Sequence, residues 1–246
     1  MELADAADVI TLRHFRSVDL VVETKPDLSP VTQADLTVEE AVAERLAFAR
    51  PDHALVGEEF GAQGSSGARA RWIVDPIDGT KNYVRGIPVY ATLLALEIDG
   101  ELTVGVASAP ALGRRWYAAR GEGAFADGER IAVSKIADLA QAKLSHSSIE
   151  NWAAKGQMAR FLDLAAAVGS TRGFGDFWQH MLVAQGSVDV AVEPEVSLWD
   201  LAALKVIVEE AGGRFTDLKG VSTAAGGSVL SSNGLLHEEA LARIGT

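Results

Sequence analysis

A six-residue segment, Asp75-Pro-Ile-Asp-Gly-Thr80, is the feature that most constrains how this chain folds. It follows the apolar run from Trp72 to Val74, which predicts a short strand that delivers carboxylates at its carboxyl end. The proline stiffens the turn, so two carboxylates three residues apart can point at one pair of cations. Mg²⁺ prefers carboxylates, carbonyls and water. Asp75, Asp78 and the carbonyl of Ile77 are therefore chemically suitable ligands.

The end of the same segment suits a phosphate group. If a helix begins there, the backbone N–H groups of Gly79 and Thr80 point toward an anion. The alternative is an ordinary turn, since Asp, Pro and Gly are all common turn residues. Two acids elsewhere favour a site. Glu58 follows a second predicted strand at 54–57, and Asp200 stands at the start of an apolar helix, where it equally suits the role of N-cap.

Composition excludes several classes of function. The chain has no cysteine, which rules out disulfides, thiolate catalysis and Cys-ligated metals. A net charge of -12, from 34 acidic and 22 basic residues, argues against a nucleic-acid partner. The first residues do not resemble a signal peptide, and no stretch approaches the roughly 20 apolar residues of a membrane span. We therefore expect no membrane partner and a cytoplasmic location.

Hydrophobic periodicity predicts a mixture of helices and strands. Strands at 90–97, 102–109 and 116–119, separated by turns, indicate an antiparallel meander. Residues 61–67, rich in Gly and Ser, predict either a mobile loop over the site or a plain connector. Further strands are expected at 140–145, 188–192 and 229–231, and helices at 3–15, 36–48, 159–168, 177–184, 201–211 and 236–244.

A soft boundary divides the chain into two halves that share one cleft. Residues 1–134 form a half with helices and an antiparallel sheet, which carries most of the predicted metal ligands. Residues 135–246 alternate between helix and strand and complete the metal and substrate site.

Three motifs occur in the order and spacing of a known family. Gly57-Glu58-Glu59, the Asp75 to Thr80 segment and Trp199-Asp200 together resemble the inositol monophosphatase superfamily of metal-dependent, lithium-sensitive phosphatases. The resemblance covers nearly the whole chain. It implies an α+β fold, a five-layer αβαβα sandwich, that hydrolyses a small phosphate monoester by attack of metal-activated water. It also implies two or three Mg²⁺ per site, Mn²⁺ as a substitute, Li⁺ as an inhibitor, and a homodimer.

The resemblance also assigns roles to individual residues. Asp75 would bridge two metals, and Glu58 would hold a third ion. Asp35 would pair with Thr80 to orient the attacking water, although the sequence around Asp35 alone predicts a helix cap. The implied first metal site is Glu58, Asp75 and the Ile77 carbonyl, the second is Asp75, Asp78 and Asp200, and the implied catalytic residues are Glu58, Thr80 and Asp35.

The segments 80–88, 108–116 and 175–178 resemble one branch of that superfamily, the histidinol-phosphate phosphatases. An anion at Asp176 suits an alcohol that carries an ammonium group, as histidinol does. The resemblance implies substrate contacts from Arg172, Asp176 and Glu193, with Glu195 as a rival for the last. Trp152 or Trp178 either stacks on the imidazole or belongs to the core.

Two alternatives stay open at this stage. The enzyme could instead hydrolyse inositol monophosphate or a broad range of small-molecule and nucleotide phosphates. A chain that binds metal without turnover, acting as a regulator, is disfavoured because Glu58, Asp35 and Thr80 are all present.

Overall fold

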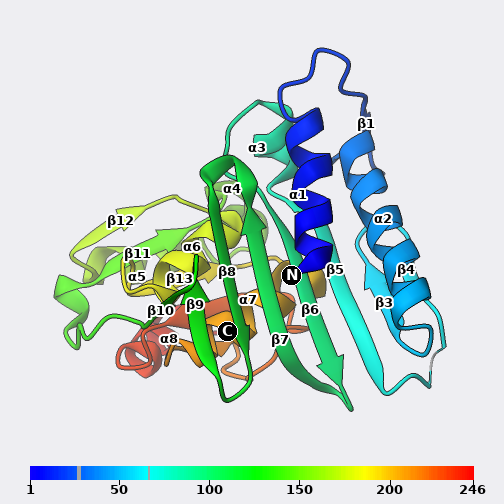
Figure 1. Ribbon diagram of the computed structural model, residues 1–246. Coiled ribbons are helices and arrows are strands. Elements are labelled where there is room, and N and C mark those ends of the chain that lie inside the picture. Colours follow the sequence, from blue (N-terminus) through cyan, green and yellow to red (C-terminus); the bar gives the residue numbers. More distant parts are fainter. Residues whose placement is uncertain (27–28, 66) are drawn as a thin grey trace.

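The computed structural model describes residues 1–26, 29–65 and 67–246, and these form five stacked layers (Figure 1). The outer layer contains helices α1 (Glu2–His14) and α2 (Gln33–Ala49), which cover one face of an eight-stranded sheet. Helices α6 (Asp176–Ala184) and α7 (Leu198–Glu210) form the middle layer. A five-stranded sheet follows, and α5 and α8 lie outside it. The predicted α+β, αβαβα architecture is confirmed.

The eight-stranded sheet has the order β10-β9-β8-β7-β6-β5-β3-β4. Its neighbours pair antiparallel except for β3 and β5, which run parallel with Gly57 opposite Val74. The carboxyl ends of these two strands therefore lie at one edge, which brings Glu58 beside Asp75. The predicted meander is confirmed as β6, β7 and β8. The strands are β3 (Ala54–Gly57), β4 (Gly61–Gln63), β5 (Ala70–Asp78), β6 (Ala91–Ile98), β7 (Glu101–Ala109), β8 (Arg114–Ala119), β9 (Gly123–Ala126) and β10 (Glu129–Ile131).

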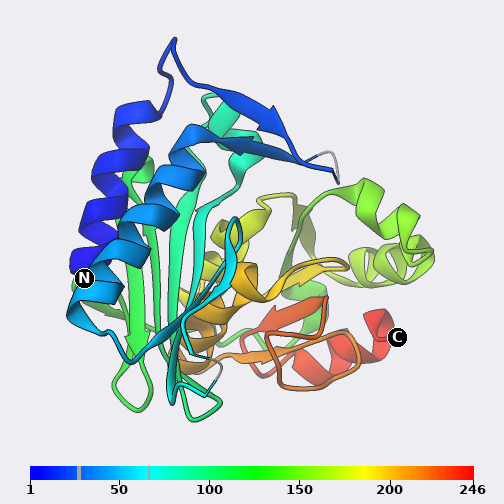
Figure 2. The ribbon, with the colours of Figure 1, turned by 90° about the vertical axis from the view of Figure 1, so that its right-hand side faces the viewer.

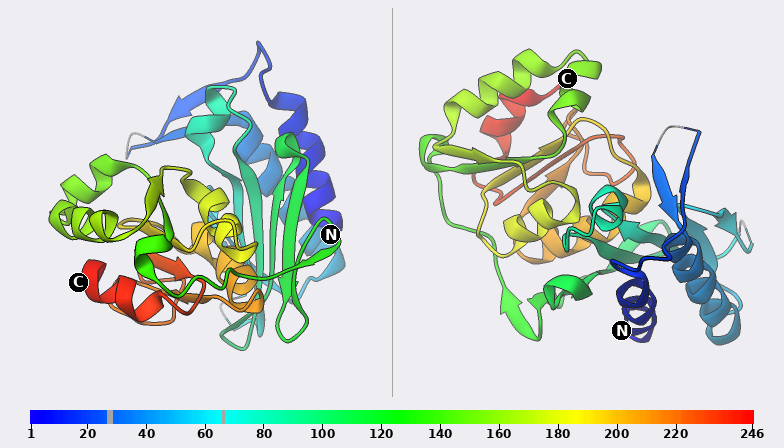
Figure 3. Two further views of the ribbon diagram at one scale, coloured as in Figure 1. Left: turned by 90° about the vertical axis from the view of Figure 1, so that its left-hand side faces the viewer. Right: turned by 90° about the horizontal axis from the view of Figure 1, so that it is seen from above.

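The five-stranded sheet has the order β12-β11-β13-β15-β14 and lies on the other side of α6 and α7 (Figure 3). Two of its strands, β12 and β14, and helix α4 were not predicted, because each is only three to six residues long. The elements are β11 (Lys143–His146), α4 (Ile149–Ala154), α5 (Met158–Ala167), β12 (Ser170–Arg172), β13 (Val190–Glu193), β14 (Arg214–Thr216), β15 (Val229–Ser232) and α8 (His237–Ile244), with 3₁₀ turns at Pro110–Leu112 and Leu139–Gln141.

Helix α7 fixes the position of one site carboxylate because it is packed on both sides. Leu201, Leu204 and Ile207 are almost completely buried in the core cluster between the two sheets. Strand β7 meets the helix at Gly105, where an added Cβ would lie 2.3 Å from the carbonyl oxygen of Ala203. This close approach of two backbones holds the first turn of α7, and with it Asp200, over the carboxyl end of β5.

Residues 61–67 differ from the prediction of a loop. Gly61–Gln63 forms β4, which pairs with β3 through residues Leu55 to Gly57, so the backbone hydrogen bonds of a hairpin hold this part of the segment. Ser66 lies outside the described residues.

A second hairpin, β1 (Val22–Thr24) and β2 (Pro30–Thr32), extends from the layer of α1 and α2 (Figure 2). It carries Lys25 close to the site. The whole eight-stranded sheet precedes residue 135 and the whole five-stranded sheet follows it, while α6 and α7 separate the two sheets. The division into halves at 134/135 stays a prediction. Within the described part of the chain, none of the helices combines the length and apolarity needed to cross a bilayer.

Candidate active site

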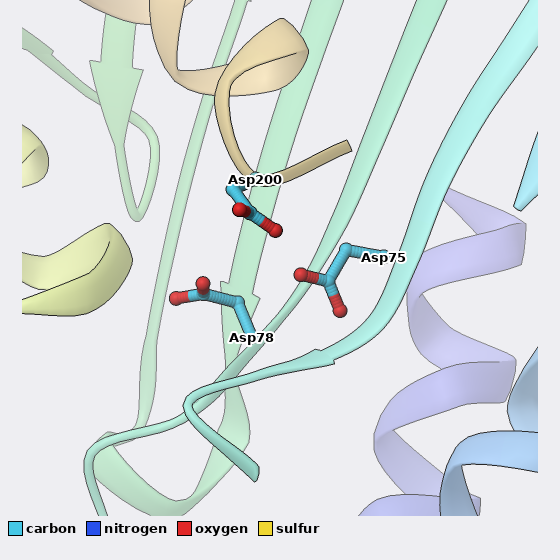
Figure 4. Close-up of side chains that lie close together, drawn as sticks. All are labelled: Asp75, Asp78 and Asp200. Atoms are coloured by element: carbon cyan, nitrogen blue, oxygen red, sulfur yellow. The ribbon is translucent and has the colours of Figure 1, made fainter. Parts of the chain in front are cut away.

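Three aspartates converge at the carboxyl end of β5. One oxygen each of Asp75, Asp78 and Asp200 lies within 4.8 Å of the others, and Figure 4 shows the three side chains pointing toward one another. In a regular strand, residues three apart face opposite sides. The register of β5 against β6 shifts between Asp75 and Asp78, which aims both side chains at one point.

Two of these carboxylates are anchored through one oxygen. Asp78 Oδ2 accepts the backbone N–H of Phe177 at 2.6 Å, and Asp200 Oδ2 accepts that of Ser197 at 2.7 Å. Ser197 is the N-cap of α7, and Asp200 is the third helical residue, which completes a capping box. The alternative that Asp200 is itself the N-cap is therefore wrong.

The third carboxylate has an unsatisfied atom. Asp75 is only 1% exposed, and its Oδ1 is buried without a hydrogen-bond partner among the described residues. Such an atom is costly unless a ligand satisfies it. Burial, together with the charges of Glu58, Asp78 and Asp200, raises the pKa of Asp75 well above its ordinary range. A set of oxygen donors that repel one another and lack a partner fits a bound divalent cation.

The pKa values of the other two aspartates shift in the same direction. Burial raises the pKa of Asp78 well above its ordinary range, and the charges of Asp176 and Asp200 add to the effect. Burial also raises the pKa of Asp200 to about 7, with a further contribution from Glu58.

Glu58 contacts a cation that the sequence did not predict. Its Oε1 accepts a hydrogen bond from Lys25 Nζ at 2.7 Å, and the same ammonium contacts Glu59 Oε1 at 2.6 Å. Burial opposes the charge of Lys25, but its bonds to the two glutamates raise its pKa above the ordinary value. The role of Glu58 as a metal ligand stays a prediction.

Glu39, also missed from the sequence, supports the turn that carries Glu58. This buried residue of α2 accepts the backbone N–H groups of Glu59 at 2.9 Å and Phe60 at 3.0 Å. Its carboxylate lies so close to Gly57 that an added Cβ there would be 1.8 Å from Oε1. The glycine of the Gly57-Glu58-Glu59 motif therefore makes room for Glu39.

Asp35 serves both the helix and the site. Its Oδ2 accepts the N–H and hydroxyl of Thr32 at 2.8 and 2.6 Å, which completes the capping box of α2. Its Oδ1 lies 3.4 Å from Thr80 Oγ1, which also lies 2.8 Å from the carbonyl of Ile77. Burial raises the pKa of Asp35 to about 6. The structure thus brings the predicted pair together, and both interpretations of Asp35 describe real contacts.

A cavity of about 220 Å³ joins most of the predicted residues. Gly79 begins the short helix α3 (Thr80–Val84) with a φ of +84°, a conformation that favours glycine. The predicted residues that line the cavity are Glu58, Asp75, Ile77, Asp78, Gly79, Thr80, Asp176, Glu193 and Asp200. A larger cleft of about 480 Å³, around Arg71 and Lys205, contains no predicted site residue.

Two further carboxylates line this cavity. Asp176, the first residue of α6, has a φ of +47°, and its Oδ2 accepts Asn82 Nδ2 at 2.9 Å. Burial and the neighbouring charge of Glu193 raise the pKa of Asp176 to about 7. Glu193, at the end of β13, accepts hydrogen bonds from Gln179 and His180.

Three other residues from the substrate prediction are not in the lining. Arg172 is exposed, and its Nη1 donates to the carbonyl of Thr171 at 2.7 Å. Trp152 is fully buried and stacks on Phe161, as in a core, and Trp178 packs against Phe174. The rival residue Glu195 does line the cavity and pairs with Lys155 at 2.7 Å. The substrate role of Arg172 stays a prediction.

Comparison with known proteins gives concordant findings. The model of the inositol monophosphatase family matches residues 1–245. A histidinol-phosphatase of Mycobacterium tuberculosis is 53% identical over 99% of this chain and 95% of its own length. One from Streptomyces coelicolor is 50% identical, with 97% and 92% covered. Among solved structures, an inositol monophosphatase (IMPase) of Thermotoga maritima superposes with a TM-score of 0.88 at 32% identity, covering 99% of this chain and 94% of that one. The suhB protein of Bartonella henselae gives 0.92 at 29%, with 99% and 95% covered.

Proposed function

The chain belongs to the inositol monophosphatase family and is a phosphoric monoester hydrolase, and from that premise we propose that its substrate is L-histidinol phosphate and its metal Mg²⁺. The observation that carries the proposal is that a single cavity combines the three-aspartate cluster with Asp176 and Glu193. An uncharged alcohol gives no reason for two extra anions beside the leaving group. The ammonium of histidinol does.

The residues that would hold Mg²⁺ are Asp75, Asp78 and Asp200, joined by Glu58 and the carbonyl of Ile77. The unpartnered Oδ1 of Asp75 supports this assignment. Bound Mg²⁺ would supply positive charge that offsets the phosphate dianion and makes water more acidic.

The chain's own residues orient the reactants. The Thr80 hydroxyl donates toward Asp35 or the carbonyl of Ile77, which leaves its lone pairs to accept a hydrogen bond from the attacking water. The N–H groups of Gly79 and Thr80 would bind phosphate oxygens. The water oxygen bonds to phosphorus as the ester P–O bond breaks, and the alcohol leaves with a proton that the water gave up.

Phosphate release with L-histidinol phosphate and with inositol 1-phosphate tests the proposal. We expect kcat/KM to favour histidinol phosphate by about a hundredfold, which corresponds to roughly 3 kcal/mol. Activity should disappear in excess EDTA and return with Mg²⁺, and to a smaller extent with Mn²⁺. Comparable constants for the two esters would retain the metal-dependent reaction and refute the substrate.

We also infer a homodimer and a cytoplasmic location, both supported by the family resemblance. Light scattering coupled to gel filtration tests the first. A mass near the 25.9 kDa of one chain would refute the dimer.

A further inference from the structure

Glu193 is held by only one of its two carboxylate oxygens. Oε1 accepts Gln179 Nε2 at 2.7 Å and His180 Nε2 at 3.0 Å. No donor from the described part of the chain reaches Oε2. Because Glu193 is 7% exposed and lines the cavity, Oε2 is the oxygen that remains for a ligand.

The imidazole of His180 is itself fixed in place. It is completely buried, and its Nδ1 lies 2.7 Å from Ser231 Oγ. An ionised Glu193 can only accept, which assigns the proton to Nε2, so Nδ1 of the neutral ring accepts the Ser231 hydroxyl. Ser231 lies on β15 opposite Ala191 of β13, the strand that ends at Glu193. The carboxylate is therefore tied to α6 and to two neighbouring strands.

One helix face organises both carboxylates of the substrate end. Gln179 and His180 follow Asp176 by three and four residues in α6, a spacing that places all three on the same face. The helix thus supplies the first carboxylate from its own first turn and orients the second from the next turn.

We propose that Gln179 and His180 are positioning residues that set the alcohol specificity of this site. By holding Oε1 of Glu193, they keep Oε2 directed into the cavity, where it and Asp176 share the ammonium of the leaving alcohol. The inference rests on the proposed function, because that ammonium is the ligand which two carboxylates can share.

Substitutions of His180 test the proposal. His180→Phe keeps an aromatic ring but removes the Nε2 donor, whereas His180→Gln retains an N–H donor at the same distance along the side chain. We expect the KM for L-histidinol phosphate to rise about tenfold in His180→Phe, the size expected for losing one hydrogen bond to a charged group. His180→Gln should recover most of this loss, and kcat should change by less than about threefold in both variants.

Two controls separate positioning from packing. p-Nitrophenyl phosphate has no ammonium group, so its KM should change by less than about twofold in His180→Phe. His237→Gln alters another completely buried histidine, which bonds Thr216 and Ser232 and does not line the cavity. It should leave the KM for both substrates unchanged.

Gln179→Leu gives an independent test if His180→Phe does not fold. Gln179 is completely buried, and its Oε1 has no partner among the described residues. Leucine therefore removes a donor to Glu193 together with an unsatisfied acceptor, and the loss of stability should be small. The KM for histidinol phosphate should rise while that for p-nitrophenyl phosphate does not.

The outcomes distinguish this inference from the proposed function. Wild-type protein without a preference for histidinol phosphate refutes the function, and the variants are then measured on the preferred ester. On either ester, a raised KM that His180→Gln restores supports the positioning role. An unchanged KM, or an equal fall in kcat on all esters without rescue, overturns it.

Discussion

Replacing Asp176 by Asn isolates the charge that we assign to substrate selection. The amide has the shape of the carboxylate and keeps an oxygen for the Asn82 Nδ2 donor, now 2.9 Å from Asp176 Oδ2. Asn also adopts a positive φ about as readily as Asp, so the φ of +47° at this position adds no new strain. Only the negative charge is lost.

The expected effect on catalysis follows from that charge. An ammonium 4 Å from a carboxylate gains about 4 kcal/mol at an effective dielectric constant of 20, before desolvation is counted. Hydrogen bonds to charged groups retain about 1.5 to 3 kcal/mol of such a gain. We therefore expect kcat/KM for L-histidinol phosphate to fall about 10- to 150-fold. Most of the fall should be in KM, because the ammonium takes no part in the breaking bond.

The same substitution should stabilise the metal-free protein. Burial and Glu193 raise the pKa of Asp176 to about 7, so the ionised carboxyl costs folding free energy. This cost is absent below pH 4 and grows as pH rises toward 7, because the unfolded chain ionises first. At pH 8 in EDTA, Asp176→Asn should be more stable on the order of 3 kcal/mol, at 1.4 kcal/mol for each pH unit of pKa shift.

Steady-state phosphate release and urea unfolding measure the two effects, with Asp217→Asn as the matched control. Asp217 is also buried, but it accepts the N–H groups of Lys219 and Val221 away from the cavity. Its substitution should lower stability and leave the ratio of specificity constants unchanged. If Asp176→Asn lowers kcat/KM equally for histidinol phosphate and p-nitrophenyl phosphate, the charge does not select the alcohol and the reasoning is wrong.

Three further predictions concern metal, pH and backbone. Asp75→Asn should abolish Mg²⁺-dependent turnover by at least about 10³-fold and weaken Mg²⁺ binding in calorimetry, because it removes the charge of the most buried ligand; unchanged binding would contradict this. Burial lowers the pKa of His237 to about 4, so wild type should lose up to about 3 kcal/mol as pH falls from 6.5 to 4, a slope that His237→Gln lacks when the two unfolding curves are compared. Gly57→Ala should cost about 1 to 3 kcal/mol in Tm-derived stability and reduce turnover, since its Cβ would lie 1.8 Å from Glu39 Oε1; a neutral result would show that Glu39 moves freely.

The sequence predicts the metal cluster well because its geometry is mostly local. Asp75 and Asp78 belong to one turn, and Glu58 follows a strand that runs parallel to the strand before Asp75. Periodicity also locates the long helices and the meander, whose elements bury a regular face. It fails for β4, because the Gly- and Ser-rich composition of residues 61–67 contains no apolar alternation and the strand exists only through its pairing with β3.

The residues that support the site could not be predicted in this way. Lys25 meets Glu58 across 33 positions, and Asn82 meets Asp176 across 94. Neither Lys25 nor Asn82 belongs to a motif, so only the fold brings these partners together. His180 was expected to be a structural or surface residue, and burial is indeed complete. Its contact with Glu193 depends on which face of α6 meets β13, which periodicity alone does not specify.

The site carboxylates share one principle of construction, in which one oxygen serves the fold and the other serves the chemistry. Oδ2 of Asp35 closes the capping box of α2 while Oδ1 faces Thr80. Oδ2 of Asp200 and Oδ2 of Asp78 accept backbone N–H groups at helix starts, and each residue still contributes an oxygen to the cluster. Glu193 repeats the pattern with side-chain donors in place of backbone. Anchoring each carboxylate in this way offsets part of the repulsion between like charges and removes rotamer freedom before any ligand arrives. Asp75 is the exception, because its Oδ1 has no partner in the described chain. The oxygen that folding leaves unsatisfied is thus the one placed at the centre of the proposed metal site, where a cation gains the most by binding.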